Sequence, residues 1–110
     1  MPRVFVAASV LLIALLTGCR SHVVTVTIHN ATNTTLRNVE FQYPGGSFGK
    51  NTMPPGDSYT YRIKVMRSGS PVLNVDAEGT LRTKSGPALQ ANSEGALQVE
   101  ITDSDISFAR

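Results

Sequence analysis

Few side chains in this 110-residue sequence are suited to catalysis or metal binding, and their spacing favours neither. Cys19 is the only cysteine, and His22 and His29 are the only histidines. The histidines, together with Met53 or Met66, are candidate ligands for a transition metal. On an uninterrupted strand, their separation of seven residues would place them on opposite faces and about 23 Å apart. We therefore expect solvated histidines, no metal site and no cofactor.

Carboxylates and hydroxyls offer other kinds of chemistry. Asp103-Ser104-Asp105 has the clustered oxygens that calcium prefers, but we expect it to be only the polar end of the last strand. Asp76 and Glu78 share a strand face, an arrangement that is common on exposed strands. No serine lies in a nucleophile-elbow motif, and residues 45–50 lack the spacing of a phosphate loop. We therefore expect no enzymatic activity.

The N-terminal residues are typical of an export signal. Met1-Pro2-Arg3 is positively charged, and residues 4–16 are apolar except for Ser9. As a helix this run would rise about 20 Å, which is short of the roughly 30 Å needed to cross a bilayer. The segment Leu15-Leu16-Thr17-Gly18-Cys19 resembles the lipobox of bacterial lipoproteins. The resemblance implies that Cys19 receives a diacylglycerol and that the chain is cut before it.

This resemblance divides the chain into three parts: a signal peptide over residues 1–18, a lipidated cysteine with a short tether over residues 19–22, and a domain over residues 23–110. Two or more acyl chains hold a protein stably on a membrane. Arg20 is not the aspartate that commonly signals retention in the inner membrane, so we expect the outer membrane where a cell has two. The alternative is an ordinary secretory signal followed by a chance cysteine.

Most of the remaining sequence alternates between apolar and polar residues, which predicts strands with one buried face. The expected strands cover residues 24–29, 38–43, 47–53, 58–65, 72–77, 80–84 and 97–102. Leu36 is out of phase with Val39, which predicts a turn or a bulge between them. On the expected apolar faces we place Tyr61, Ile63, Val75, Val99 and Ile101, together with Leu81 and Thr83.

Clusters of turn-forming residues separate these strands. Two of them, Asn30-Ala31-Thr32 and Asn33-Thr34-Thr35, match glycosylation acceptors, but we expect both to form a polar loop. Pro54-Pro55-Gly56-Asp57 has the composition of a type II turn, which requires a positive φ at its glycine. Residues 45–50 are expected to form a glycine-rich hairpin or loop.

Short strands at this spacing predict an all-β fold, namely a single antiparallel seven-strand sandwich that follows the cleaved signal peptide. The segment Met53-Pro54-Pro55-Gly56-Asp57-Ser58-Tyr59 resembles the turn that enters a middle strand in immunoglobulin-like and fibronectin type III-like domains. The resemblance implies an immunoglobulin-like sandwich of the kind that bacteria use for adhesion, assembly or scaffolding. The fold alone does not select among these roles.

Four basic residues form a candidate partner-binding patch. Arg62 and Lys64 are expected on the solvent face of one strand, and Arg82 and Lys84 on that of another. If the two faces adjoin, the patch would attract an anionic polymer, lipid headgroups or an envelope protein. The alternative is that acidic residues pair with them across the sheet, namely Glu40, Asp76 and Glu100.

These features together predict a function in the bacterial cell envelope. The chain has 10 Lys and Arg against 8 Asp and Glu, a balance that gives no nucleic-acid footprint. We expect a lipid-anchored accessory or interaction domain that contacts the membrane through Cys19. The alternative is a periplasmic or surface carrier that binds a metal ion or small ligand at the loops of the sandwich.

Overall fold

The computed structural model describes residues 22–110, which form an all-β domain without helices. Cys19 and the expected signal peptide lie outside the described residues. None of residues 22–110 belongs to a helix that is long and apolar enough to span a membrane. The strands are β1 (Val24–Asn30), β2 (Leu36–Tyr43), β3 (Gly46–Met53), β4 (Ser58–Ile63), β5 (Val72–Ala77), β6 (Thr80–Ser85), β7 (Gly95–Ile101) and β8 (Ile106–Ala109).

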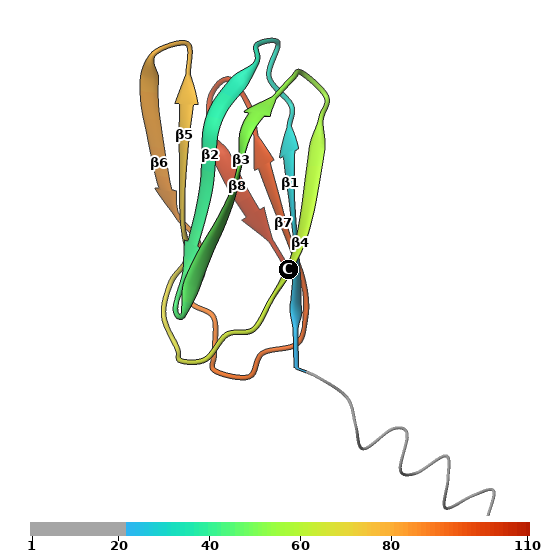
Figure 1. Ribbon diagram of the computed structural model, residues 1–110, viewed down its shortest axis with the longest axis vertical. Coiled ribbons are helices and arrows are strands. Elements are labelled where there is room, and N and C mark those ends of the chain that lie inside the picture. The colour runs from blue at the N-terminus through green and yellow to red at the C-terminus, as the bar shows by residue number, and fades with distance from the viewer. Residues whose placement is uncertain (1–21) are drawn as a thin grey trace, which may run out of the picture.

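Two four-stranded sheets form the two layers of a sandwich (Figure 1). One sheet has the order β4-β1-β7-β8 and the other β3-β2-β5-β6. Neighbouring strands are antiparallel except for β1 and β7, which run parallel. In a constant-type immunoglobulin domain the first two strands share a sheet, whereas here β1 and β2 belong to different sheets. The two packed sheets are the architecture that was expected, but the parallel pairing of β1 with β7 departs from the fully antiparallel sandwich that was predicted.

The sandwich has eight strands rather than the seven expected, because the chain continues past the predicted last strand. Thr102 and Asp105 close a tight turn, in which the Thr102 N–H donates to the Asp105 carbonyl at 2.8 Å. Residues after this turn then pair with β7 as β8, in which Ile106 is buried. The Asp103-Ser104-Asp105 segment is therefore a hairpin turn and not the end of the last strand.

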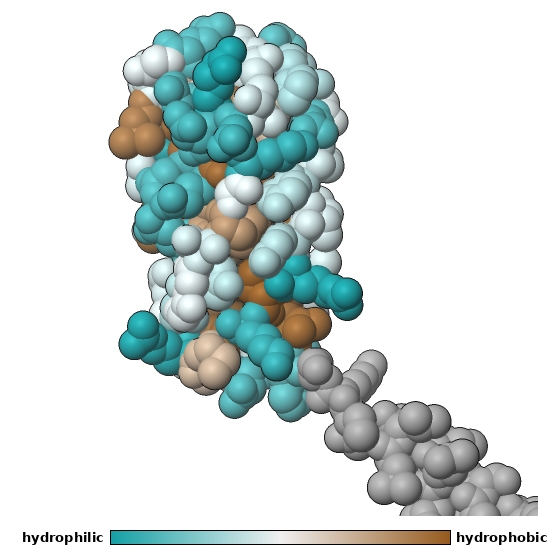
Figure 2. Space-filling model, in the orientation of Figure 1, coloured by the Kyte–Doolittle hydropathy of each residue, from teal (hydrophilic) through white to brown (hydrophobic). Residues whose placement is uncertain are grey.

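The core fills the space between the sheets with aliphatic side chains from both layers. On β1 the alternation is complete, since Val24, Val26 and Ile28 are each fully buried. Every strand pair and every core residue among the described residues lies within residues 24–109. Residues 19–110 therefore contain every strand and core residue that the structure describes. On the face shown in Figure 2, hydrophilic residues predominate and hydrophobic ones form small separate areas.

The predicted irregularity near Leu36 is a β-bulge. The register between β2 and β5 shifts between Arg37 and Glu40, and Asn38 has a φ of 49°. One extra residue in β2 changes the phase of the alternation. Leu36 and Val39 can therefore both point into the core, where they are 0% and 2% exposed.

The predicted type II turn over residues 54–57 is also present. The Asp57 N–H donates to the Pro54 carbonyl at 3.0 Å, and Gly56 has a φ of 83°. The turn is attached to the end of β1, because the Gly56 N–H donates to the Asn30 carbonyl at 2.8 Å and the Asn30 N–H donates to the Asp57 carbonyl at 2.9 Å. This contact aligns β4 for its pairing with β1.

The strand directions give the domain two distinct ends. Because β4 is antiparallel to β1 and Ile63 pairs with Val24, the chain leaves β4 beside the point at which it enters β1. The β2–β3, β4–β5 and β6–β7 connections lie at this end, which we name the tether end (Figure 1). The β1–β2, β3–β4, β5–β6 and β7–β8 connections lie at the opposite end, which we name the distal end.

Candidate functional site

Aromatic rings close one open side of the sandwich, where the outer strands β3 and β4 of the two sheets face each other. We name Phe48, Tyr59 and Tyr61 the aromatic edge. Phe48 and Tyr61 are stacked, with 4.8 Å between ring centroids and 19° between ring planes. The Tyr59 ring lies 6.0 Å from Phe48 and 6.5 Å from Tyr61. These rings pack β3 of one sheet against β4 of the other. Their offset and tilted arrangements are those that aromatic pairs prefer.

Tyr61 was predicted to be buried, but its side chain is 45% exposed. Its register partner is Val26, a fully buried residue, so Tyr61 is on the inner face of the sheet as expected. Because β4 is the outermost strand of its sheet, however, no further strand covers the ring. Ile63, Val75, Val99 and Ile101 are buried as predicted.

A charged pair lies at the distal side of the aromatic edge. The Lys50 ammonium donates to the Asp57 carboxylate at 2.8 Å and lies 5.6 Å from the centroid of the Tyr59 ring. The hydrogen bond from Lys50 holds the pKa of Asp57 below its ordinary value, and the Ser58 backbone N–H lowers that pKa further. Lys50 thereby connects the β3–β4 turn to the rings, with a cation–π contact as an additional attraction.

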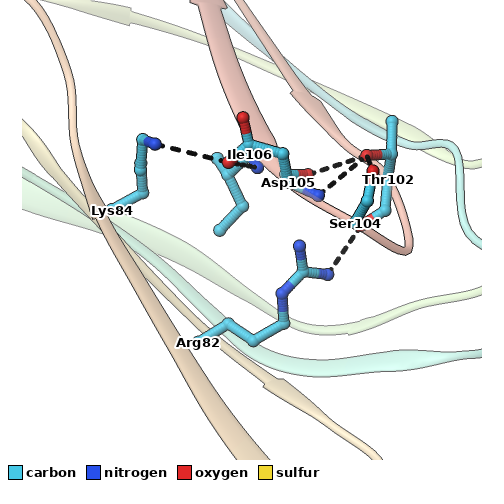
Figure 3. Close-up of polar contacts among 6 residues, drawn as sticks. All are labelled: Arg82, Lys84, Thr102, Ser104, Asp105 and Ile106. Carbon is cyan, nitrogen blue, oxygen red and sulfur yellow. Dashed lines mark hydrogen bonds and ion pairs between the residues drawn. The ribbon is translucent and has the colours of Figure 1, made fainter.

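The opposite side of the sandwich is closed by basic residues of β6 (Figure 3). Arg82 donates to the Thr102 carbonyl at 2.7 Å, and Lys84 lies 3.3 Å from the Asp105 carboxylate. The Ile106 backbone N–H, followed by Lys84, holds the pKa of Asp105 below its ordinary value. A hollow of about 230 Å³ between β6 and the β7–β8 turn is lined by both cations and by this carboxylate.

The face assigned to Arg82 and Lys84 in the sequence analysis is wrong. Their register partners on β5 are Val75 and Leu73, which are buried. Directly opposed residues in an antiparallel pair share a face, so both basic side chains lie on the inner face of the sheet. Leu81 lies on the outer face and is 71% exposed. An outermost strand tolerates this inversion because its inner face reaches solvent at the open side of the sandwich.

The four basic residues do not lie on one sheet face. Arg62 pairs in register with Thr25 on the outer face of its sheet. Lys64 follows the end of β4 and is exposed in the β4–β5 loop. Arg82 and Lys84 belong to the other sheet. The structure thus brings Arg82 close to Lys84 on β6, and it places Arg62 on the face of β4 opposite to Tyr61.

The remaining candidate residues have polar neighbours of their own. The His22 Nδ1 atom lies 2.6 Å from the Glu94 carboxylate, which connects the start of the domain to the β6–β7 loop. His29 lies on β1 between Ser58 and Glu100. Among residues 22–110, no group of three or more His, Cys, Asp or Glu residues is placed to hold a metal ion.

The aromatic edge was missed as a site by the sequence analysis. One signal was present, because tyrosines occupy two successive apolar positions of the fourth strand, where aliphatic residues would suit a dry core better. A tyrosine has an apolar ring and a polar hydroxyl, and it is therefore common at partly solvated positions. Comparisons of this chain with protein-family models, curated proteins and solved structures found no match.

Proposed function

We propose that this chain is a lipid-anchored interaction domain of the bacterial cell envelope, without catalytic activity, that binds an envelope polymer of sugar rings and acidic groups. The proposed anchor is lipid on Cys19, in the outer membrane where the cell has two membranes. The observation that carries the binding proposal is the aromatic edge, and above all the exposed ring of Tyr61.

The anchor is supported by the apolar run and the small residues that precede Cys19. Radiolabelled palmitate is expected to enter the wild-type protein in a bacterium that processes lipoproteins. It is not expected to enter a Cys19→Ser variant, because that variant lacks the thiol that accepts the diacylglycerol. Equal labelling of the two proteins would refute the anchor and leave the binding proposal to be judged separately.

The aromatic edge is suited to a sugar polymer for two reasons. Tyr61 stacks on Phe48 and still exposes 45% of its surface, so part of an apolar ring is open to the C–H face of a sugar. Arg62 follows Tyr61 on the same outermost strand and is exposed on the outer face. Tyr61 and Arg62 lie on opposite faces of this outermost strand, so a polymer must reach around its free edge to contact both the ring and the guanidinium, which pairs well with carboxylates.

Binding can be measured by co-sedimentation of residues 19–110 with purified cell-wall sacculi. Tyr61→Ala and Arg62→Glu are each expected to weaken binding at least about fivefold, the effect of losing about 1 kcal/mol. Leu81→Ala is the matched control, because Leu81 is 71% exposed on β6, away from the aromatic edge. Wild-type binding by folded Tyr61→Ala and Arg62→Glu variants would refute the proposal.

We also infer a relationship to immunoglobulin-like interaction domains. It is supported by the two packed sheets and by the type II turn that precedes β4. Of the four basic residues expected to bind a partner, Arg62 is retained for polymer binding. Lys64 lies in the exposed β4–β5 loop, outside the proposed polymer site. Arg82 and Lys84 are assigned to closing the other side of the sandwich, because both have polar partners there.

A further inference from the structure

The tether end carries an exposed surface made of Lys64, Met66 and Arg67, which we name the tether-end surface. Met66 is 70% exposed, and both basic neighbours are exposed as well. All three residues belong to the β4–β5 loop, which starts beside the residue at which β1 begins. In Figure 2 hydrophobic atoms are visible in the lower part of the domain, toward this end.

The loop that carries this surface is held in place by the neighbouring β6–β7 loop. Gly69 and Leu89 exchange two backbone hydrogen bonds of 3.0 and 2.8 Å, and the Asn92 N–H donates to the Val65 carbonyl at 2.8 Å. Val65 is buried, so the residue directly before Met66 is fixed in the core. Because the loop is already ordered, a contact through the exposed Met66 side chain would cost little conformational entropy of the backbone.

The length of the tether limits how far this surface can lie from a lipid on Cys19. His22 is three positions after Cys19, and an extended chain spans at most about 3.5 Å per residue, or roughly 10 Å here. The Debye length at physiological ionic strength is about 8 Å. The start of the domain would therefore lie at most slightly more than one Debye length from the lipid, so anionic headgroups would still attract cations at this end, with partial screening.

The connections at the two ends of the domain carry different charged residues. In the described distal connections the charged residues are all acidic: Asp57, Glu78, Asp103 and Asp105. At the tether end, Lys64 and Arg67 lie in the β4–β5 loop, and the carboxylate of Glu94 is next to His22. An anionic surface would therefore attract the connections at the tether end more than those at the distal end, where Lys50 and Lys84 pair with Asp57 and Asp105.

We propose that the tether-end surface rests on an anionic lipid bilayer, with Met66 among the headgroups and Lys64 and Arg67 against lipid phosphates. This inference rests on the anchor at Cys19 proposed above, which supplies the high local concentration that two cations and one apolar side chain need. The contact fixes the orientation of the sandwich, with β1 pointing away from the membrane and the aromatic edge facing sideways.

The test uses residues 19–110, coupled through Cys19, the only cysteine, to a maleimide phospholipid in vesicles. Chemical coupling supplies the anchor, so the result does not depend on lipidation in the cell. The chain contains no tryptophan, and Met66→Trp therefore gives a single fluorophore at the tether end. On vesicles of phosphatidylglycerol and phosphatidylcholine, the fluorescence of Trp at this position is expected to shift to the blue and to be quenched by brominated lipids.

Leu81→Trp is the matched control, because Leu81 is as exposed as Met66 (71% against 70%) but lies on β6 near the distal end. Its fluorescence is expected to be unquenched. Replacing phosphatidylglycerol by phosphatidylcholine, or adding Lys64→Glu and Arg67→Glu, should reduce quenching at position 66 at least twofold. Arg37→Glu, an exposed charge at the distal start of β2, should leave it unchanged.

Three results would overturn the inference while the anchor remains in place. The first is equal quenching at positions 66 and 81, and the second is quenching at 66 that does not depend on the anionic lipid. The third is a blue shift at position 66 that grows with protein density and is insensitive to bromine. That third result would assign the surface to a second copy of the chain. The palmitate experiment with Cys19→Ser tests the anchor itself.

Discussion

Replacing Asn30 by alanine is expected to destabilise the domain severely, although this residue was predicted to lie in a polar loop. Asn30 is fully buried at the end of β1. Its side-chain amide donates to the carbonyls of Thr34 and Met53, both at 2.9 Å. Its Oδ1 accepts from the Thr32 N–H at 2.9 Å and from the Thr32 hydroxyl at 2.6 Å. The side chain thus joins the β1–β2 loop to the end of β3.

The size of the effect follows from which partners lose their bond. In the absence of the Asn30 side chain, the single proton of the Thr32 hydroxyl can be donated to the Thr34 carbonyl, which lies 3.0 Å away. The buried Thr32 N–H and Met53 carbonyl each lose the bond that Asn30 makes. An unsatisfied buried group costs about 1 to 3 kcal/mol, so Asn30→Ala should reduce the free energy of unfolding by about 2 to 6 kcal/mol.

Urea denaturation of residues 19–110, followed by circular dichroism, measures this loss. Asn33→Ala is the matched control, because Asn33 is the exposed asparagine of the second glycosylation-like triplet and should change stability by less than about 0.5 kcal/mol. If Asn30→Ala does not fold, Thr32→Val provides a milder change that keeps the Thr32 N–H bond to Asn30. Equal stabilities of the Asn30→Ala and Asn33→Ala variants would refute the reasoning.

Three further predictions concern the turn, the core and the basic side. Gly56→Ala should cost about 1 kcal/mol or more from its φ of 83° alone, because no heavy atom lies within 4 Å of the added Cβ; urea denaturation checks this. Ile63→Ala should cost about 2 to 5 kcal/mol, and Thr60→Ala on the opposite face much less; similar losses would refute the register of β4. The lowered pKa of Asp105 stabilises the folded state above the unfolded pKa of about 3.9. The stability advantage of wild type over Asp105→Asn should therefore vanish as the pH falls through the lower folded pKa, and Lys84→Met should raise that pKa in an NMR titration.

The sequence correctly predicted the strands in which burial follows directly from the alternation of apolar and polar residues. β1 and β7 are flanked by strands on both sides, so every apolar residue on their inner faces is covered, as for Val26 and Val99. The bulge in β2 was also predictable, because Leu36 and Val39 are both apolar and out of phase. In each case the local pattern and the buried face agree.

The errors concern strands at the sheet margins. The alternation pattern does not show which strands will be outermost in their sheets. On an outermost strand, a residue on the inner face can still reach solvent. Tyr61 is exposed for this reason, and Arg82 and Lys84 can point inward because they reach polar partners at the open side. β8 was missed because Asp103-Ser104-Asp105 is compatible with both a chain end and a turn.

The two open sides of the sandwich are closed by different means, and this difference bears on the proposed function. Inward-pointing charges on an outermost strand discourage pairing with a strand of another molecule, and β6 provides them through Arg82 and Lys84. Lipid anchoring would concentrate copies of the domain on the membrane surface, where an unprotected outermost strand would pair more readily with the same strand of another copy. The side formed by β3 and β4 has aromatic rings instead, and Tyr61 remains exposed. Because β4 runs toward the tether end, this aromatic edge would extend upward from the membrane, where a polymer above the lipid surface can reach it.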